Sequence, residues 1–301
     1  MAGALITSDF QIQLGPDSGG LLLGAGTPYD VIELDGWDDM PPLSLTDVNK
    51  PTVPGAWAGP MYPEERTITA TIQVAGTPGF TGTPTTAQYA ANVAALRRAT
   101  NPGADTTVEV PFVVQLGGQQ LMASVRCQQR AAPITQGYAS PGLDKVTMQF
   151  VASDPRRYAP GVQTASCGLY SSTGGLAYPI TYPLTWGTIT GTGTLTIANA
   201  GDTATPPLLT ITGGGTTPTI TRQDTGQSLI IDLALQATDT LVVDVLNERL
   251  LLDGSSVYSA LDPASDPIGA FLIGSGMTTL GLSVASGTGT TMTASWQSAY
   301  L

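Results

Sequence analysis

Alternating apolar and polar residues predict β-strands in the first half of the chain. The apolar residues of segment 67–74 (TITATIQV) fall on every second position: Ile68, Ala70, Ile72 and Val74. Successive side chains of a strand point to opposite faces, so this pattern predicts a strand with one buried face. Two further segments alternate in the same way, 121–127 and 146–152.

A helical period replaces the alternation in one segment, near residues 85–99 (TTAQYAANVAALRRA). Its apolar residues recur at spacings of four and three: Tyr89, Val93 and Leu96. This spacing places them on one face of a helix. A threonine cap at the start and two arginines in the last turn suit the helix dipole, and Asn101-Pro102-Gly103 is predicted to end the helix.

Segments 15–30 and 35–63 are rich in Gly, Pro and Asp and are expected to form long loops or arms. Long connections of this kind usually carry a functional surface or are ordered by a partner. The composition changes near 153–163, which divides the chain into two expected domains, 1–160 and 161–301.

Short strand candidates separated by turn residues fill the second domain. They are 193–198, 208–212, 228–235, 240–246, 249–252, 279–284 and 291–297. Seven short strands without a helix of useful length are typical of a β-sandwich or jelly roll. Asn247-Glu248 is expected to be a two-residue hairpin connection. The predicted fold is therefore mainly β, with a β-rich N-terminal domain that carries one packed helix and a C-terminal β-sandwich.

Composition excludes several classes of function. The 301 residues include no histidine, so no Ser-His-Asp triad, His-ligated zinc or haem-His site can form from this chain. The two lysines, Lys50 and Lys145, follow Asn49 and Asp144, which excludes a phosphate-binding loop ending in Gly-Lys. A net charge of −12 repels nucleic acid and anionic lipid. We expect no sequence-specific nucleic-acid binding, no membrane insertion, no cofactor and no metal.

Cysteine usage and the N-terminus indicate the compartment of synthesis. Cys127 and Cys167 form neither a disulfide framework nor a metal-ligand spacing. The first residues, MAGALITSDFQIQLG, lack the features of a signal peptide. The protein is therefore expected to be made in a reducing cytosol.

Two groups of acidic residues are candidates for chemistry. The first group is Glu33, Asp35, Asp38 and Asp39, whose carboxylates suit Ca²⁺ but lack EF-hand spacing, so a solvated loop is preferred. The second is Glu64-Glu65, which would have to supply the carboxylate pair of a glycosidase. Adjacent residues of a strand point to opposite faces, so a structural role is preferred here also.

Aromatic and basic residues suggest contact surfaces. The four tryptophans could stack on sugars: Trp37, Trp57, Trp186 and Trp296. Trp296 shares strand parity with apolar residues and is expected in the core. The candidate subunit-interface residues are Trp37, Trp57, Tyr62, Arg66, Arg126 and Arg130, the arginines as pairing partners across strands or subunits.

Short motifs follow one another in a fixed order in the second half of the chain. They are FVASDPRRY (150–158), GLAYPITYPLTWG (175–187), the stretch from Asn199 to Asp253 that opens with NAGDTATPPLLTITGG, and a last strand ending in Trp296. Together they resemble the distal tail (Dit) and related minor tail proteins of siphovirus-type phages, whose tails are long and non-contractile. The resemblance covers about half of the chain well, and the first half loosely through RTITATIQVAG and the helix.

This resemblance implies a structural virion protein of the tail tip, without catalysis. The N-terminal domains of the family form a hexameric ring that joins the tail tube to the tail-tip and baseplate proteins around a channel for DNA. The C-terminal domain is galectin-like or a jelly roll and projects outward. Assembly would take place in the host cytoplasm. Where the family pattern has Pro-Gly-x-Asn, this chain has Gly274-Ser275-Gly276-Met277.

A closed ring needs two complementary patches on each subunit, and the Pro- and Gly-rich segments are expected to supply one of them. Trp57→Ala and Arg66→Glu are then expected to weaken the ring while the monomer stays folded. Two alternatives remain open: a tail-associated module that binds cell-wall glycan, and a glycosidase with paired carboxylates.

Overall fold

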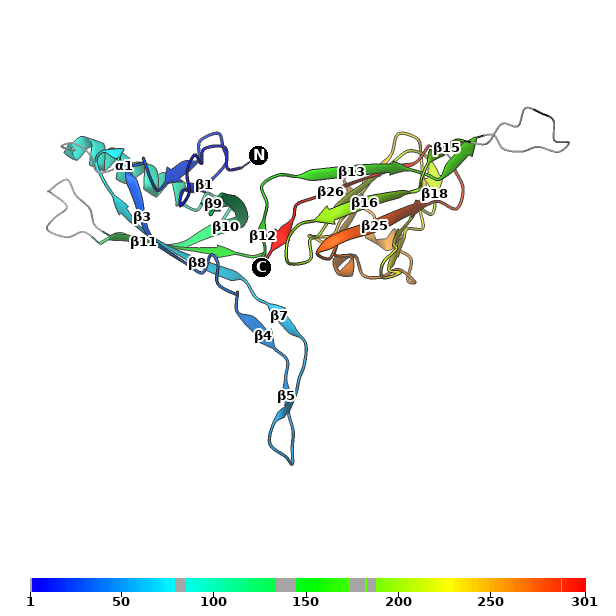
Figure 1. The fold of residues 1–301 in the computed structure, drawn as a ribbon, viewed down its shortest axis with the longest axis horizontal. Coiled ribbons are helices and arrows are strands. Elements are labelled where there is room, and N and C mark those ends of the chain that lie inside the picture. The colour runs from blue at the N-terminus through cyan, green and yellow to red at the C-terminus, as the bar shows by residue number, and fades with distance from the viewer. Residues whose placement is uncertain (1, 79–84, 134–144, 174–181, 183–187, 288) are drawn as a thin grey trace. The chain divides into compact units, whose positions relative to one another are not determined.

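The computed structural model describes residues 2–78, 85–133, 145–173, 182, 188–287 and 289–301. The chain forms two compact units, Met1–Pro160 together with Leu301, and Gly161–Tyr300 (Figure 1). Each unit is described by itself below. The motif 175–187, including Trp186, lies outside the described residues except for Tyr182.

One antiparallel sheet forms the body of the N-terminal unit. Its strands follow the order β2-β1-β9-β10-β11-β8-β3, and β12 pairs with β10. Their bounds are β1 Ile12–Leu14, β2 Leu21–Leu23, β3 Tyr29–Asp35, β8 Arg66–Val74, β9 Val110–Leu116, β10 Gln119–Ala131, β11 Lys145–Ala152 and β12 Arg157–Tyr158. The three strands predicted from alternation are thus β8, the middle of β10, and β11.

The core of this unit lies on the face of β8 that the alternation predicts. Ile68, Ala70, Ile72 and Val74 are all fully buried. Aromatic rings extend this core: the ring centroid of Phe112 lies 5.1 Å from that of Phe150 and 5.5 Å from that of Trp37. Tilted aromatic pairs at this separation add to the free energy gained from apolar burial.

The predicted helix is α1, Thr86–Ala99. Thr85 and Gln88 form a reciprocal capping box at its start, and Arg97 and Arg98 occupy its last turn. The side-chain amide of Asn92 donates to the carbonyl of Ala75 at 2.7 Å, which ties the helix to the end of β8.

The C-terminal unit is a sandwich of two antiparallel sheets, β13-β26-β17-β22-β23-β24 and β16-β25-β19-β20. The first sheet consists of β13 Gln163–Gly168, β17 Leu208–Thr212, β22 Thr240–Asp244, β23 Arg249–Leu252, β24 Ser255–Ser256 and β26 Thr291–Trp296. The second consists of β16 Thr194–Asn199, β19 Thr219–Arg222, β20 Ser228–Ile230 and β25 Gly276–Ser283. One apolar cluster joins residues of both sheets, so the core lies between them.

Smaller elements complete this unit. They are the pairs β14 Ser171–Thr173 with β15 Thr188–Gly191 and β18 Gly215–Thr216 with β21 Ala234–Leu235, the short strand β27 Ala299–Tyr300, and the 3₁₀ turns η3 Tyr258–Ala260 and η4 Ile268–Ala270. The segment predicted as one strand, 228–235, is therefore divided between β20 and β21.

Asn199 explains one of the motifs that carry the family resemblance. Its buried amide donates to the carbonyls of Thr203, Ile273 and Gly274, at 2.7, 3.4 and 3.3 Å. Its amide oxygen accepts from Gly201 N and Ala299 N. A Cβ on Gly201 would lie 1.7 Å from the carbonyl oxygen of Ala299, so only glycine fits beside this node.

One local expectation is wrong, and the structure makes another more specific. The connection between β22 and β23 has four residues, 245–248, because the strands pair Asp244 with Arg249 and Glu248 takes a left-handed backbone (φ 52°). Of the two segments expected to form loops or arms, 35–63 contains the two strand pairs of an arm described below, and 15–30 contains β2 and the start of β3.

Candidate functional site: a projecting arm and its root

A two-stranded arm, residues 41–65, leaves the sheet of the N-terminal unit between β3 and β8 (Figure 1). It is built from the pair β4 Leu43–Leu45 with β7 Met61–Pro63, and farther out from β5 Val48–Asn49 with β6 Ala56–Trp57. Between the pairs, Thr46 Oγ1 donates to the carbonyl of Pro60 at 2.6 Å, and Gly59 N donates to Asp47 Oδ1 at 2.9 Å. These bonds hold the arm together where its ladder is interrupted.

The arm and its approach expose large apolar side chains. They are Met40, Leu45, Val48, Val53, Trp57, Met61 and Tyr62, each more than half exposed. Soluble monomers rarely expose a contiguous apolar patch without a use for it, and an isolated two-stranded ribbon is marginally stable in water. The arm therefore has the properties of a contact surface that is completed by a partner.

Arg66, at the start of β8, fixes the root of the arm. Its side chain is 1% exposed and donates to four backbone carbonyls: Pro155 at 2.8 Å, Gly36 at 2.9 Å, Trp37 at 3.0 Å and Asp39 at 2.6 Å. Three of these carbonyls belong to the turn that leads from β3 into the arm. Burial, assisted by the nearby charge of Arg157, lowers the pKa of Arg66 to about 10.

A second arginine completes the root. Arg157 Nη1 lies 2.7 Å from Asp38 Oδ1, and its guanidinium stands 5.8 Å from the centroid of the Trp37 ring. Gly36 is required in this turn, because its φ is +75° and a Cβ would lie 2.0 Å from the carbonyl oxygen of Thr67. The acidic residues predicted as a solvated loop thus have different roles. Asp38 and Asp39 hold the turn, while Glu33 and Asp35 are exposed on β3.

The structure separates the six residues predicted for the subunit interface. Trp57 and Tyr62 lie on the exposed arm, 57% and 60% exposed. Trp37 is 2% exposed and Arg66 is 1% exposed, so both are used inside the unit and offer little surface to another subunit. Arg66→Glu would therefore disrupt the monomer and is not a clean test of an interface.

The other two predicted arginines pair within the unit. Arg126 Nη2 donates to Ser153 Oγ at 3.1 Å, and its Nε lies 3.7 Å from Glu109 Oε1. Arg130 Nη1 donates to the hydroxyl of Thr100 and to the carbonyl of Arg97, at the C-terminal end of α1. A cation there complements the helix dipole, which the sequence alone did not indicate for this residue.

The remaining candidates can be placed as well. Trp296 is buried and donates from Nε1 to the carbonyl of Ala198 at 2.9 Å, which confirms its predicted place in the core. Glu64 and Glu65 are exposed at the base of the arm. Among the described residues, no three Cys, Asp or Glu side chains are grouped so as to hold a metal ion. No helix of the described part of the chain is long and apolar enough to cross a membrane.

Comparison with known structures first defines the class. The chain is similar to the crystal structure of the Dit protein of phage SPP1, with a TM-score of 0.60 and 15% identity, over 91% of this chain and 94% of that one. It is also similar to two structures of the phage P2 baseplate in its activated conformation, with Ca and with Sr. Their TM-scores are 0.49 and 0.47, at 11% and 12% identity, over 96% and 95% of this chain and 98% and 97% of theirs. The likeness to SPP1 Dit shows that the mainly β fold is that of a Dit protein.

A family model matches part of the C-terminal unit. Residues 200–300 match the family described as "Siphovirus-type tail component, C-terminal domain". This match confirms the resemblance to siphovirus distal tail proteins that the ordered motifs indicate. No curated protein sequence matches the chain.

Proposed function

We propose that this protein is a distal tail hub, a structural component of the phage tail tip that forms a homohexameric ring. The ring joins the tail tube to the tail-tip and baseplate proteins. Two observations support this proposal. Residues 200–300 match the C-terminal domain of a siphovirus-type tail component, and the chain has the fold of SPP1 Dit, a protein described as a paradigm of the hub adsorption apparatus. The work of such a protein is mechanical, and it has no catalytic step.

The arm supports self-assembly. A ring of identical subunits has heterologous contacts, in which one patch meets a different patch of the neighbour. An arm that exposes Trp57 and Tyr62 is suited to be one of these patches, because buried aromatic side chains commonly dominate the binding energy of an interface.

The acidic charge of the chain supports passage of DNA through the ring. Six copies would carry six times a net charge of −12, so acids that line the channel would repel the phosphates and keep the genome from adhering. A density map of the assembled ring is expected to show an acidic lumen. A basic lumen would contradict this part of the proposal.

The first test is the mass of the purified full-length protein by light scattering, with negative-stain images of the same sample. We expect particles of six subunits with a central hole. Trp57→Ala is expected to weaken assembly at least about tenfold in the concentration required, since loss of a central aromatic anchor commonly costs 2 kcal/mol or more.

Tyr258→Ala is the matched control for this test, because Tyr258 is an aromatic residue of similar exposure in the other unit. It should assemble like the unsubstituted chain. Rings that form equally well with Trp57→Ala would remove the arm from the interface. If the protein stays monomeric in solution and also forms no ring on the ends of isolated tail tubes, the ring itself is contradicted.

A further inference from the structure

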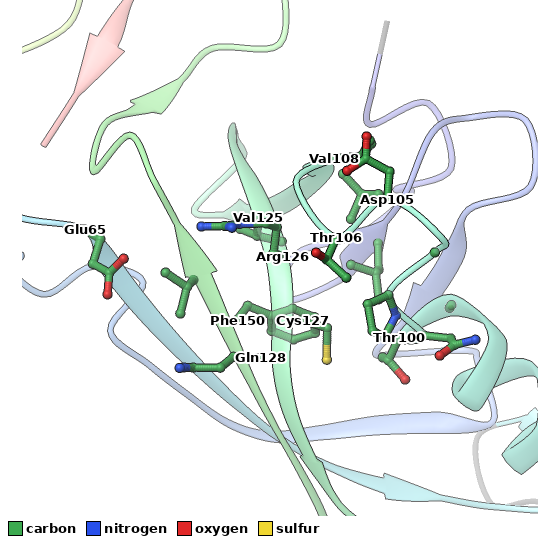
Figure 2. A pocket seen from close by; sticks show the side chains of 17 residues that line it. Glu65, Thr100, Asp105, Thr106, Val108, Val125, Arg126, Cys127, Gln128 and Phe150 are labelled. Carbon is green, nitrogen blue, oxygen red and sulfur yellow. The ribbon is translucent and has the colours of Figure 1, made fainter.

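A cleft opens on the N-terminal unit between the strands β10 and β11 and the segment that follows α1. Its volume is about 620 Å³, within the range of sites that take up a ligand or a group of side chains. Figure 2 shows Glu65 on one side of the cleft, Asp105, Thr106 and Val108 on the other, and Phe150 and Cys127 between them.

The lining of the cleft combines an exposed apolar and acidic rim with a buried base. Val108, 60% exposed, is an accessible apolar side chain of the rim, while Val125, Phe150 and Val151 lie beneath the cleft and are themselves buried in the core. Asp105 and Glu65 stand on the rim, and the hydrogen bonds from Thr107 lower the pKa of Asp105, so this carboxylate is charged at neutral pH. The basic residue of the lining, Arg126, already faces Glu109.

We propose that this cleft receives the tip of the arm of a second copy of the chain, a contact that rests on the ring proposed above. The arm is then the donor patch of a heterologous contact and the cleft its acceptor. Because Glu65 lies at the base of the arm and also lines the cleft, each arm tip would meet the arm root of the next subunit.

The occupant is a second copy because the arm of the same chain points elsewhere. The arm runs away from the sheet that carries the cleft (Figure 1). Its paired strands run from Leu43 to Asn49, which at roughly 3.3 Å per residue amounts to roughly 23 Å, and the turn 50–55 lies beyond them. A paired ribbon of this length reaches beyond its own unit and does not fold back into a cleft beside its root.

Charge and apolar character agree between the two patches. Lys50 is the single basic residue of the arm and lies at its tip, between the exposed Val48 and Val53. The acidic rim of the cleft, with Asp105 and Glu65, is complementary to that cation, and the exposed Val108 beside it offers an apolar contact to the arm. Like charges on arm and cleft would instead oppose the contact.

Cysteine trapping tests the contact in the full-length protein. Cys127 is partly exposed and lines the cleft, whereas Cys167 is buried in the other unit. A cysteine placed in turn at Val48, Val53 and Ala58 is expected to form an intermolecular disulfide with Cys127 at one or more positions under mild oxidation. Non-reducing gels would then show a ladder of linked subunits.

The matched controls are Cys127→Ser in each of these variants and a cysteine at Tyr258. Neither should give a ladder. Rings by light scattering without cross-links at all three arm positions would overturn the inference and leave the proposed hub function standing.

A charge exchange tests the same contact without requiring a closed ring. A cyclised, fluorescein-labelled peptide of residues 43–63 is titrated into the full-length Trp57→Ala variant, whose own arm is weakened. Adding Asp105→Lys should reduce affinity by about tenfold, and a peptide with Lys50→Asp should restore it.

The outcomes separate the two proposals. Peptide binding that follows the exchange supports the cleft, and if the unsubstituted chain nevertheless forms no rings by light scattering, the hexamer is contradicted while the cleft stands. Absence of peptide binding, or binding that is indifferent to Asp105→Lys, overturns the cleft whatever the state of assembly.

Discussion

Arg66 shows at the level of one residue how a charged side chain can serve a fold without an acidic partner. An arginine at the beginning of an alternating strand suggests a surface ion pair. In the structure its guanidinium instead donates hydrogen bonds to three carbonyls of the turn, of which the bond to Trp37 is buried and the other two are partly buried. A planar group with five donors suits this task, and lysine does not.

Removing this side chain is expected to destabilise the N-terminal unit. Arg66→Ala removes four hydrogen bonds to buried and partly buried carbonyls, and hydrogen bonds to charged groups contribute about 1.5–3 kcal/mol each, so we expect the free energy of unfolding to fall by at least about 3 kcal/mol. Urea unfolding of the full chain under monomeric conditions measures this decrease as a change in the free energy of unfolding of the N-terminal unit.

Arg126→Ala is the control for this change, because its side chain is 40% exposed and makes a long ion pair. It should cost less than about 1 kcal/mol. Equal effects of the two substitutions would show that the carbonyl contacts of Arg66 do not stabilise the root of the arm.

At the scale of elements, the sequence predicts strands well where one face is buried and the other is polar. β8 and β11 follow this rule over nearly their whole length. β3 does not follow this rule, because a bulge between Val31 and Glu33 breaks the alternation and its exposed residues include acidic ones. The arm strands could not be predicted for another reason. They bury neither face within the monomer, so their sequence has no hydrophobic period.

Because the arm buries so little, we expect it to be dispensable for folding. A variant in which residues 44–62 are replaced by a short Asn-Gly turn should keep the stability of the N-terminal unit within about 1 kcal/mol, because few side chains of the arm leave water in the monomer. The same variant should fail to assemble. Thermal unfolding and light scattering on one preparation measure both effects, and a large loss of stability would show that the arm belongs to the monomer's core.

At the scale of the whole molecule, the candidate site is harder to predict than the fold. Composition and strand spacing suffice for a mainly β chain with a C-terminal sandwich. Trp37 is buried beside the turn at Gly36, whereas Trp57 is exposed farther along the arm. Both tryptophans lie in one Pro-rich segment, and nothing in the local sequence indicates which of them is buried. The cleft is lined by residues from distant segments and has no motif at all.

The two units have separate apolar cores, and this leads to a prediction for the whole chain. Every member of the C-terminal cluster lies within Gly161–Tyr300, including the fully buried Phe271. A chain of residues 161–300 should therefore fold alone, with a melting temperature within about 3 °C of one of two transitions in the full-length protein.

Substitutions in the full chain give the reciprocal result. Phe271→Ala leaves a cavity in that core, so it should lower the free energy of unfolding by about 3–5 kcal/mol, and only in the transition that the shorter chain reproduces. Phe112→Ala, equally buried in the other unit, should lower only the other transition. Calorimetry on the unsubstituted chain, the shorter chain and the two variants distinguishes the possibilities. If either substitution moved both transitions together, the units would unfold as one cooperative structure, and the sandwich could not act as an independent module on the tail tip.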